Sequence, residues 1–133
     1  MKYLLDTNIC IYLIRQQPEK VIREMAKQQI GDVGISSVTV AELQYGVAKS
    51  VYIERNRAAL EQFLAPLVIA DFDATAAMVY GVTRASLERH GTSIGSLDTL
   101  IAAHALSLDV ALVTNNEREF GRLPDLRVVN WAA

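Results

Sequence analysis

The stretch that decides the fold is Lys2-Tyr3-Leu4-Leu5-Asp6-Thr7-Asn8, at the start of the chain. Its apolar residues predict a buried strand that ends abruptly at Asp6 and is followed by an apolar helix at 9–14. In open α/β sheets the binding crevice lies outside the carboxyl ends of the strands. Asp6 therefore stands where a functional carboxylate is expected, although a single acid in this position more often caps the following helix.

Apolar segments of the same kind alternate with helical patterns along the chain. We expect further strands at 33–35, 67–69, 111–114 and 126–129, and further helices at 18–28, 38–49, 53–66, 74–89 and 97–108. This alternation predicts a parallel sheet with right-handed crossovers and helices on both faces. The predicted fold class is α/β, a three-layer α/β/α sandwich around a central, mostly parallel twisted sheet, formed by residues 1–133 as a single domain.

The ends of the expected helices carry polar and glycine signals. The expected N-caps are Ser36 or Ser37, Asp73 and Ser96. Gly91 follows a last turn and is the expected helix stop. The segment Asp71-Phe72-Asp73 looks like a metal motif, but Asp73 is better explained as the cap of the helix at 74–89.

The composition excludes several classes of protein. Hydrophobic residues make up 51% of the 133 residues and there are only seven glycines, which indicates a compact globular chain and not a disordered one. No apolar run approaches the length of a membrane span, and the amino terminus does not resemble a signal peptide. Cys10 is the only cysteine, so no internal disulfide is possible and a reducing cytoplasm is the expected location. The net charge of −2 argues weakly against a nucleic-acid binder, although clustered acids would mask a basic rim.

The helix at 97–108 carries the most informative acid after Asp6. Its expected buried stripe consists of Leu97, Ile101, Ala105 and Leu108. Asp98 lies about 60° from Ile101 around the helix and therefore faces the protein. A buried charge needs a cation, a hydrogen-bond network or a metal, but a first-turn acid favoured by the helix dipole is an equally open interpretation. His104 shares the apolar face and is expected to be a core histidine with satisfied hydrogen bonds.

Two further acids complete a candidate cluster. Glu42 lies at the edge of an apolar helix face, where a glutamate is usually solvated, but it follows a strand by less than two turns. Glu119 belongs to the polar segment 115–119 after the strand at 111–114. Mutually repelling carboxylates gather only with compensation, which hard cations such as Mg²⁺ or Mn²⁺ provide. Because neither a Ser-His-Asp order nor a Gly-rich phosphate loop is present, the pattern favours metal-assisted phosphodiester hydrolysis.

Four short motifs follow one another along the chain at recognisable spacing. They are Leu4-Leu5-Asp6-Thr7-Asn8, Ser36-Ser37-Val38-Thr39-Val40-Ala41-Glu42-Leu43 with Gly46, Gly95-Ser96-Leu97-Asp98-Thr99-Leu100-Ile101-Ala102-Ala103-His104-Ala105, and Leu112-Val113-Thr114-Asn115-Asn116-Glu117-Arg118-Glu119-Phe120. In order and spacing the chain resembles the PIN-domain ribonucleases, and most closely the VapC toxins of bacterial toxin–antitoxin pairs. Each motif alone is weak, but four in order are specific and cover essentially the whole chain.

The resemblance implies a PIN-like fold and an Mg²⁺-dependent endoribonuclease, with Mn²⁺ as a substitute. By the same resemblance Asp6 and Asp98 are the principal metal ligands and Glu42 completes an acidic triad. The family often has a fourth acid where Asn116 stands, which puts a full second metal site in doubt. Glu119, one helical turn further on, is the expected replacement and the fourth catalytic residue.

The resemblance also implies substrates and partners. Thr7, Thr114 and Asn116 are the expected contacts to ligands or to the substrate phosphate. We expect RNA as substrate, with tRNA favoured and the initiator tRNA anticodon loop as the target in some relatives. The expected partners are a VapB-type antitoxin and a second copy of the chain, with operator DNA reached only through the antitoxin and no membrane. The helix at 53–66 and the region 15–27 are candidate contact surfaces.

Three alternatives were weighed against this interpretation. A receiver-type signalling domain shares an Asp after its first strand, but it needs a second Asp after a middle strand and a Lys after the last, which are missing here. A phosphohydrolase with an Asp nucleophile needs a second acid two residues on, where Asn8 stands. A catalytically silent PIN-like binding domain remains the third alternative, and the retained acids Asp6, Glu42 and Asp98 argue against it.

Overall fold

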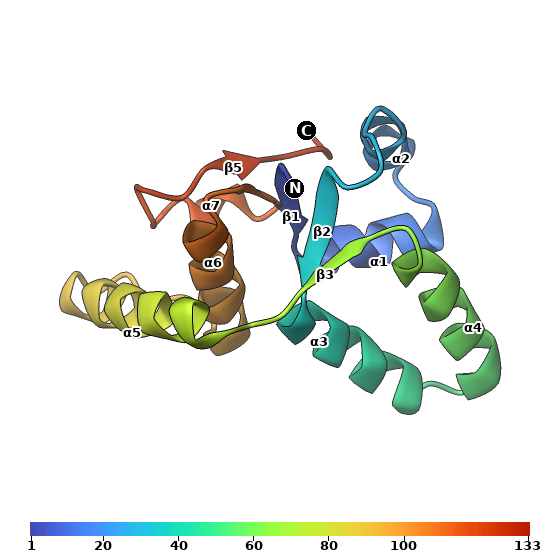
Figure 1. The fold of residues 1–133 in the computed structure, drawn as a ribbon, viewed down its shortest axis with the longest axis horizontal. Helices are drawn as coiled ribbons and strands as arrows, with labels where there is room; N and C mark the ends of the chain where they lie inside the picture. The colour runs from blue at the N-terminus through green and yellow to red at the C-terminus, as the bar shows by residue number, and fades with distance from the viewer.

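The computed structural model describes all 133 residues and shows seven helices around one sheet (Figure 1). None of these helices is both long enough and apolar enough to cross a membrane. The elements in chain order are β1 Tyr3–Leu5, α1 Thr7–Arg15, α2 Glu19–Ala26, β2 Val33–Ser36, α3 Ser37–Ala48, α4 Ile53–Leu64, β3 Val68–Ala70, α5 Ala74–Arg89, α6 Ser96–Leu108, β4 Ala111–Val113, α7 Glu117–Phe120 and β5 Val128–Val129.

The sheet has five strands in the order β3-β2-β1-β4-β5, and all four pairings are parallel. The predicted parallel α/β sandwich is therefore confirmed. β1 is the central strand, flanked by β2 and β4, so its apolar residues are shielded from water on all sides. This position explains why the short run at the start of the chain contains no polar residue until Asp6.

Two hydrophobic cores fill the space on the two faces of the sheet. Side chains alternate along a strand, so Leu4 of β1 enters one core and Leu5 enters the other. The first core is closed by α5, α6 and α7, and the second by α1, α2, α3 and α4. Figure 1 shows the same division, with α5 and α6 on one side of the sheet and α1 to α4 on the other.

The expected caps agree with the structure except at α6. Ser36 caps α3 by accepting from the Val38 N–H at 3.0 Å, and Asp73 caps α5 by accepting from the Ala76 N–H at 2.9 Å. Gly91 has a φ of 66°, as expected for a helix stop. At α6 the expected cap was wrong, because Gly95 occupies the cap position and Ser96 is the first helical residue.

The expected buried stripe of α6 was also only half right. Ile101 and Ala105 are fully buried, but Leu97 is 46% exposed and Leu108 is 37% exposed. The helix instead buries an uninterrupted run, Ile101-Ala102-Ala103-His104-Ala105. α6 is covered by α5 and by the sheet, so more than one stripe is shielded and the single-face pattern of a surface helix does not apply.

Candidate active site

The carboxyl ends of β1 and β4 lie side by side at the centre of the sheet. Leu5 pairs with Val113 in register, and the backbone N–H of Asp6 donates to the Val113 carbonyl at 3.0 Å. The chain leaves β1 for β2 on one side and returns later to β4 on the other, which makes this edge the topological switch point. Ligand crevices of α/β sheets form at such points, and Asp6 and Thr114 are the first residues beyond the two strands.

Asp6 is both a helix cap and a wall of this crevice. It is 4% exposed and accepts from the Ile9 N–H at 2.8 Å, which confirms the cap. Burial raises the pKa of Asp6; hydrogen bonds from the Thr114 hydroxyl and the Ile9 N–H oppose the rise, and the charge of Glu42 adds to it. The carboxylate is therefore held in place by the protein and still lies within electrostatic reach of a second acid.

Glu42 reaches the crevice from α3. Its Oε1 atom accepts a hydrogen bond from the Thr7 hydroxyl at 2.7 Å, which links α3 to the first residue of α1. The side chain is partly buried, so the solvated helix charge expected for an edge glutamate is not what the structure shows. Thr7 thus contacts a neighbouring carboxylate, and it sits beside Asp6 in the chain.

Asp98 has the most perturbed carboxyl group of the cluster. Its pKa is raised from 3.8 to about 6, mainly by desolvation and then by Glu119, with smaller contributions from the charges of Asp6 and Glu42. No N–H or O–H donor of the protein hydrogen-bonds to this side chain, whose only polar partner is the Glu119 carboxyl. The four acids that the sequence predicts to meet are therefore brought within electrostatic range of one another around Asp98.

Asn116 caps the start of α7, and Glu119 within α7 contacts the start of α6. Glu119 Oε1 accepts from the Gly95 N–H at 2.9 Å, at the cap position of α6. The Asn116 side chain donates to the other oxygen of Glu119, and the Asn116 N–H donates to the Thr114 hydroxyl at 3.0 Å. Asn116 therefore orients Glu119 instead of supplying a carboxylate of its own.

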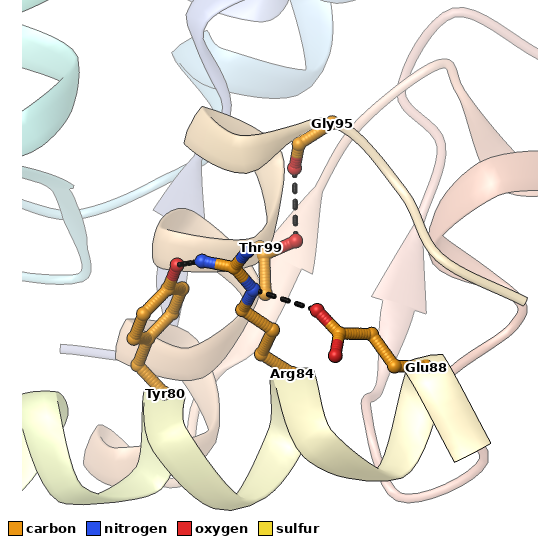
Figure 2. Close-up of polar contacts among 5 residues, drawn as sticks. All are labelled: Tyr80, Arg84, Glu88, Gly95 and Thr99. Carbon is orange, nitrogen blue, oxygen red and sulfur yellow. Dashed lines mark hydrogen bonds and ion pairs between the residues drawn. The ribbon is translucent and has the colours of Figure 1, made fainter.

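The first turn of α6, which carries Asp98, is also stabilised by a hydrogen bond of the next residue, Thr99. Figure 2 shows the Thr99 hydroxyl donating to the Gly95 carbonyl at 2.8 Å, with Arg84 of α5 alongside. Arg84 donates to Glu88 at 2.9 Å and to Tyr80 at 3.0 Å, so its charge is balanced within α5. The Asp98 side chain therefore faces other carboxylates without a protein cation to neutralise it.

The donor set fits a hard divalent cation that keeps part of its water shell. No three carboxylate, histidine or thiolate side chains converge tightly enough to form a closed metal cage. The Thr7 hydroxyl orients Glu42, and the Gly95 N–H orients Glu119. Mg²⁺ is usually bound through one or two carboxylates and several waters, which is the arrangement that such an open set of oxygens allows.

Sequence reasoning missed one polar contact beside the crevice. The Asn115 side chain donates to the Tyr12 hydroxyl at 2.7 Å and so ties the loop after β4 to α1, while its Oδ1 atom is buried without a partner. Tyr12 and Asn115 are 103 positions apart, and nothing in the local pattern of either residue indicates the contact. Cys10 is fully buried and burial raises the pKa of its thiol, so it offers no nucleophile.

A groove leads away from the acids between α1, α3 and α4. It has a volume of about 690 Å³ and is lined at one end by Thr7 and Glu42. Its walls are mainly apolar, with side chains such as Ile11 and Leu60, and cations such as Lys49 lie at its rim. Glu42 therefore belongs both to the acid cluster and to the lining of this groove.

An α/β sheet whose switch point gathers four carboxylates and no nucleophile has the arrangement of a metal-dependent nuclease. Comparison with known proteins identifies the kind. Residues 3–126 match the model of the PIN domain family. The chain is 46% identical to ribonuclease VapC2 of Rickettsia felis, with 98% of each chain covered. It is 45% identical to the tRNA(fMet)-specific endonuclease VapC of Salmonella typhimurium, again with 98% of each covered.

A solved structure supports the same family assignment. DNA-bound VapBC from Salmonella typhimurium contains a chain of 45% identity that superimposes with a TM-score of 0.94 over 99% of each chain. The chain therefore belongs to the PIN-domain family, and within it to the VapC ribonucleases, the toxins of VapBC toxin–antitoxin pairs. Ribonucleases with a PIN domain depend on a divalent metal ion, which agrees with the oxygen-only donor set. The receiver-type and nucleophilic phosphohydrolase alternatives are thereby excluded.

Proposed function

We propose that this chain is an Mg²⁺-dependent endoribonuclease that cleaves tRNA and is neutralised by a VapB-type antitoxin. The observation that carries the proposal is the environment of Asp98, a half-buried carboxyl group surrounded by Glu119, Asp6 and Glu42 and by no cation of the protein. Such a group demands an external positive charge, and a phosphodiester substrate brings an anion that the same cation attracts.

Each residue of the cluster takes a distinct role in the proposal. Asp6 and Asp98 would hold the cation, because Asp6 lies at the switch point and Asp98 has no donor of its own. Glu42, fixed by Thr7, accepts a proton from the attacking water. Mg²⁺ held there would supply the positive charge that lowers the pKa of that water and stabilises the charge developing on the phosphate. Glu119 and Asn116 hold the far edge of the site.

The same contacts and the relatives support our assignment of substrate-binding threonines and of binding partners. We assign Thr7 and Thr114 to contacts with ligands or phosphate, because their hydroxyls already face the carboxylates. The Salmonella relative is named for tRNA(fMet), which makes tRNA the first substrate to test. The Salmonella structure is a VapBC complex on DNA, which supports an antitoxin partner through which operator DNA is reached, and we propose a homodimer in the cytoplasm.

The test is a cleavage assay with the purified chain freed of antitoxin. A pool of tRNA is incubated with Mg²⁺, with Mn²⁺ and with chelator, and the cut ends are sequenced. We expect discrete cuts with either ion, clustered in an anticodon loop, and none in chelator. Undiminished cleavage in chelator would refute the metal role, and cuts spread evenly over unrelated RNA would refute the tRNA assignment.

A matched pair of variants controls for contaminating nuclease. Asp98→Asn removes the central charge with almost no change of volume, and we expect cleavage to disappear. Asp109→Asn makes the same chemical change at the exposed end of α6, where Asp109 pairs with Arg127, and we expect full activity. Equal loss in both variants would point to unfolding of α6 instead of a site effect.

A further inference from the structure

A buried hydrogen bond joins the two helices that carry Glu42 and Asp98. His104 Nδ1 lies 2.8 Å from the Ser36 hydroxyl oxygen, and the two residues are 1% and 0% exposed. Ser36 ends β2 and caps α3, which carries Glu42, while His104 lies six residues after Asp98 on α6. No other hydrogen bond links the β2–α3 junction to α6.

The hydrogen bonding around Ser36 assigns the direction of this contact. The Ser36 Oγ atom already accepts from the Val38 N–H at 3.0 Å, so its own hydrogen is free to donate to Nδ1 of His104. The nearby backbone of Asp71 favours a hydrogen on the other ring nitrogen. Burial lowers the pKa of His104, although the nearby Asp73 and Asp71 oppose this effect, and a neutral ring satisfies every contact.

A third segment closes the same cluster of contacts. Phe72, between β3 and α5, packs edge-on against the His104 ring with centroids 5.3 Å apart. The Phe72 N–H donates to the Ser37 hydroxyl at 3.0 Å. His104 therefore lies where the start of α3, the start of α5 and the middle of α6 meet. Nothing in the proposed chemistry uses this histidine, because it is sealed from the crevice and faces no carboxylate of the site.

We propose that His104 is a positioning residue that, through its hydrogen bond to Ser36, sets the spacing between α6 and the start of α3 and hence the position of Asp98 relative to Glu42 at the cation site. The proposal rests on the function proposed above. Displacements of about 1 Å at reacting groups can change rates about 100-fold, and partners behind a metal ligand affect metal affinity about 10- to 100-fold. A buried hydrogen bond between the helix that carries Asp98 and the cap of the helix that carries Glu42 is well placed to exert such an effect.

The first test compares Mn²⁺ binding to the RNA-free chain by electron paramagnetic resonance. His104→Leu keeps the volume and removes the acceptor, and we expect about 10-fold weaker Mn²⁺ binding with a circular dichroism spectrum like that of the parent. His104→Asn places an amide oxygen near the Nδ1 position, where it can accept from Ser36, and we expect it to recover most of the affinity. His90→Leu, at the exposed end of α5, is the matched control and should bind Mn²⁺ as the parent does.

The second test separates positioning from simple destabilisation. We expect His104→Leu to lower kcat for RNA about 10-fold or more while KM stays within about twofold, because the buried His104 side chain makes no contact with a bound substrate itself. Ser36→Ala removes the same contact from the other side, together with the cap of α3, and unchanged Mn²⁺ affinity in it decides against the proposal if His104→Leu does not fold. The double variant should lose no more Mn²⁺ affinity than the worse single variant, because both remove the same contact.

The two proposals fail in different ways. Parent-like Mn²⁺ affinity and kcat in His104→Leu, or in Ser36→Ala where the leucine variant is unfolded, would overturn the positioning role. A parent chain that binds Mn²⁺ but never cuts RNA would overturn the proposed function alone, and the binding series would still decide the role of His104. Loss of affinity in His104→Asn equal to that in His104→Leu would also count against the hydrogen bond.

Discussion

The starts of α1 and α6 each bring an aspartate to the same crevice, but the protein supplies hydrogen-bond donors to only one of the two carboxylates. Asp6 is almost fully buried but accepts hydrogen bonds from the Ile9 N–H and the Thr114 hydroxyl. Asp98 is more exposed, yet no donor of the protein satisfies it and its nearest polar partner is another acid, Glu119. Asp6 is the cap of α1, whereas Asp98 is the third residue inside α6, so both the position in the helix and the surrounding side chains make the difference.

Within this one site, Asp6 contributes to the stability of the fold, whereas Asp98 lowers it. The fold itself stabilises the Asp6 carboxylate, and the Asp6 side chain in turn stabilises the start of α1. The fold leaves the Asp98 carboxylate uncompensated, which destabilises the folded chain until a cation arrives. Functional sites often carry such local conflicts, and here the conflict is concentrated at α6.

The largest expected effect concerns cleavage. Asp6→Asn and Asp98→Asn should each lower RNA cleavage about 1000-fold or more, which corresponds to the several kcal/mol that a bound metal contributes to the transition state. The measurement is a single-turnover rate at saturating Mg²⁺. If either variant kept a rate within tenfold of the parent, that aspartate would have to be removed from the set of metal ligands.

The next effect tests the comparison through stability in chelator. Asp6→Ala should lower the free energy of unfolding by about 1–3 kcal/mol, because it removes a helix cap and leaves buried donors unpaired. Asp98→Ala should leave it unchanged or raise it, by at most about 1 kcal/mol once solvent screening of this half-exposed group is allowed for. Urea unfolding measures both. Equal destabilisation by the two variants would abolish the contrast drawn between α1 and α6.

The pH dependence of stability has a definite sign at Asp98. Its pKa is raised from 3.8 to about 6 in the folded chain, so the folded state binds this proton more tightly than the unfolded state. The contribution to stability is therefore fully present below pH 4 and is lost as the pH rises to 6 and above. In chelator, the difference in unfolding free energy between Asp98→Asn and the parent should grow in favour of the variant over this window. A difference that is flat from pH 4 to pH 7 would contradict the raised pKa.

The same proton should compete with the metal. Binding a cation requires the ionised Asp98 carboxylate, so the Mg²⁺ concentration for half-maximal cleavage should increase as the pH falls below about 6. A titration of Mg²⁺ at several pH values measures this shift, with tRNA held at a fixed concentration. A half-maximal concentration that is independent of pH would show that Asp98 does not gain its charge on metal binding.

The smallest effect concerns two glutamates of α7. Glu119→Gln removes one of the charges that raise the pKa of Asp98 and weakens the link to Gly95, and we expect about a 10-fold loss of cleavage. Glu117→Gln is the matched control two residues away, where the exposed side chain contacts only Asn130, and it should be neutral. Equal activity in both variants would remove Glu119 from the site.

The α6 helix shows where prediction from the sequence succeeds and where it stops. The sequence pattern located the helix and predicted that Asp98 faces inward. It also predicted that Leu97 and Leu108 are buried, but both are substantially exposed. A single-stripe pattern assumes one covered face, whereas α6 is covered by α5 as well as by the sheet. The long-range contacts of Asn115 and His104 had no local signal at all, because their partners lie 103 and 68 positions away.

The sequence by itself determined the order of strands and helices except for the short helix α7, the parallel sheet and the family, because these depend on local periodicity, on helix ends and on short motifs such as Leu4-Leu5-Asp6-Thr7-Asn8. It also nominated the four acids. Only the tertiary structure decided that Asp6 is satisfied by the protein while Asp98 is not, and that Ser36 and His104 join the helices behind them. Hydrogen bonding and desolvation depend on what surrounds a side chain in space, and residues far apart in the chain supply most of those surroundings.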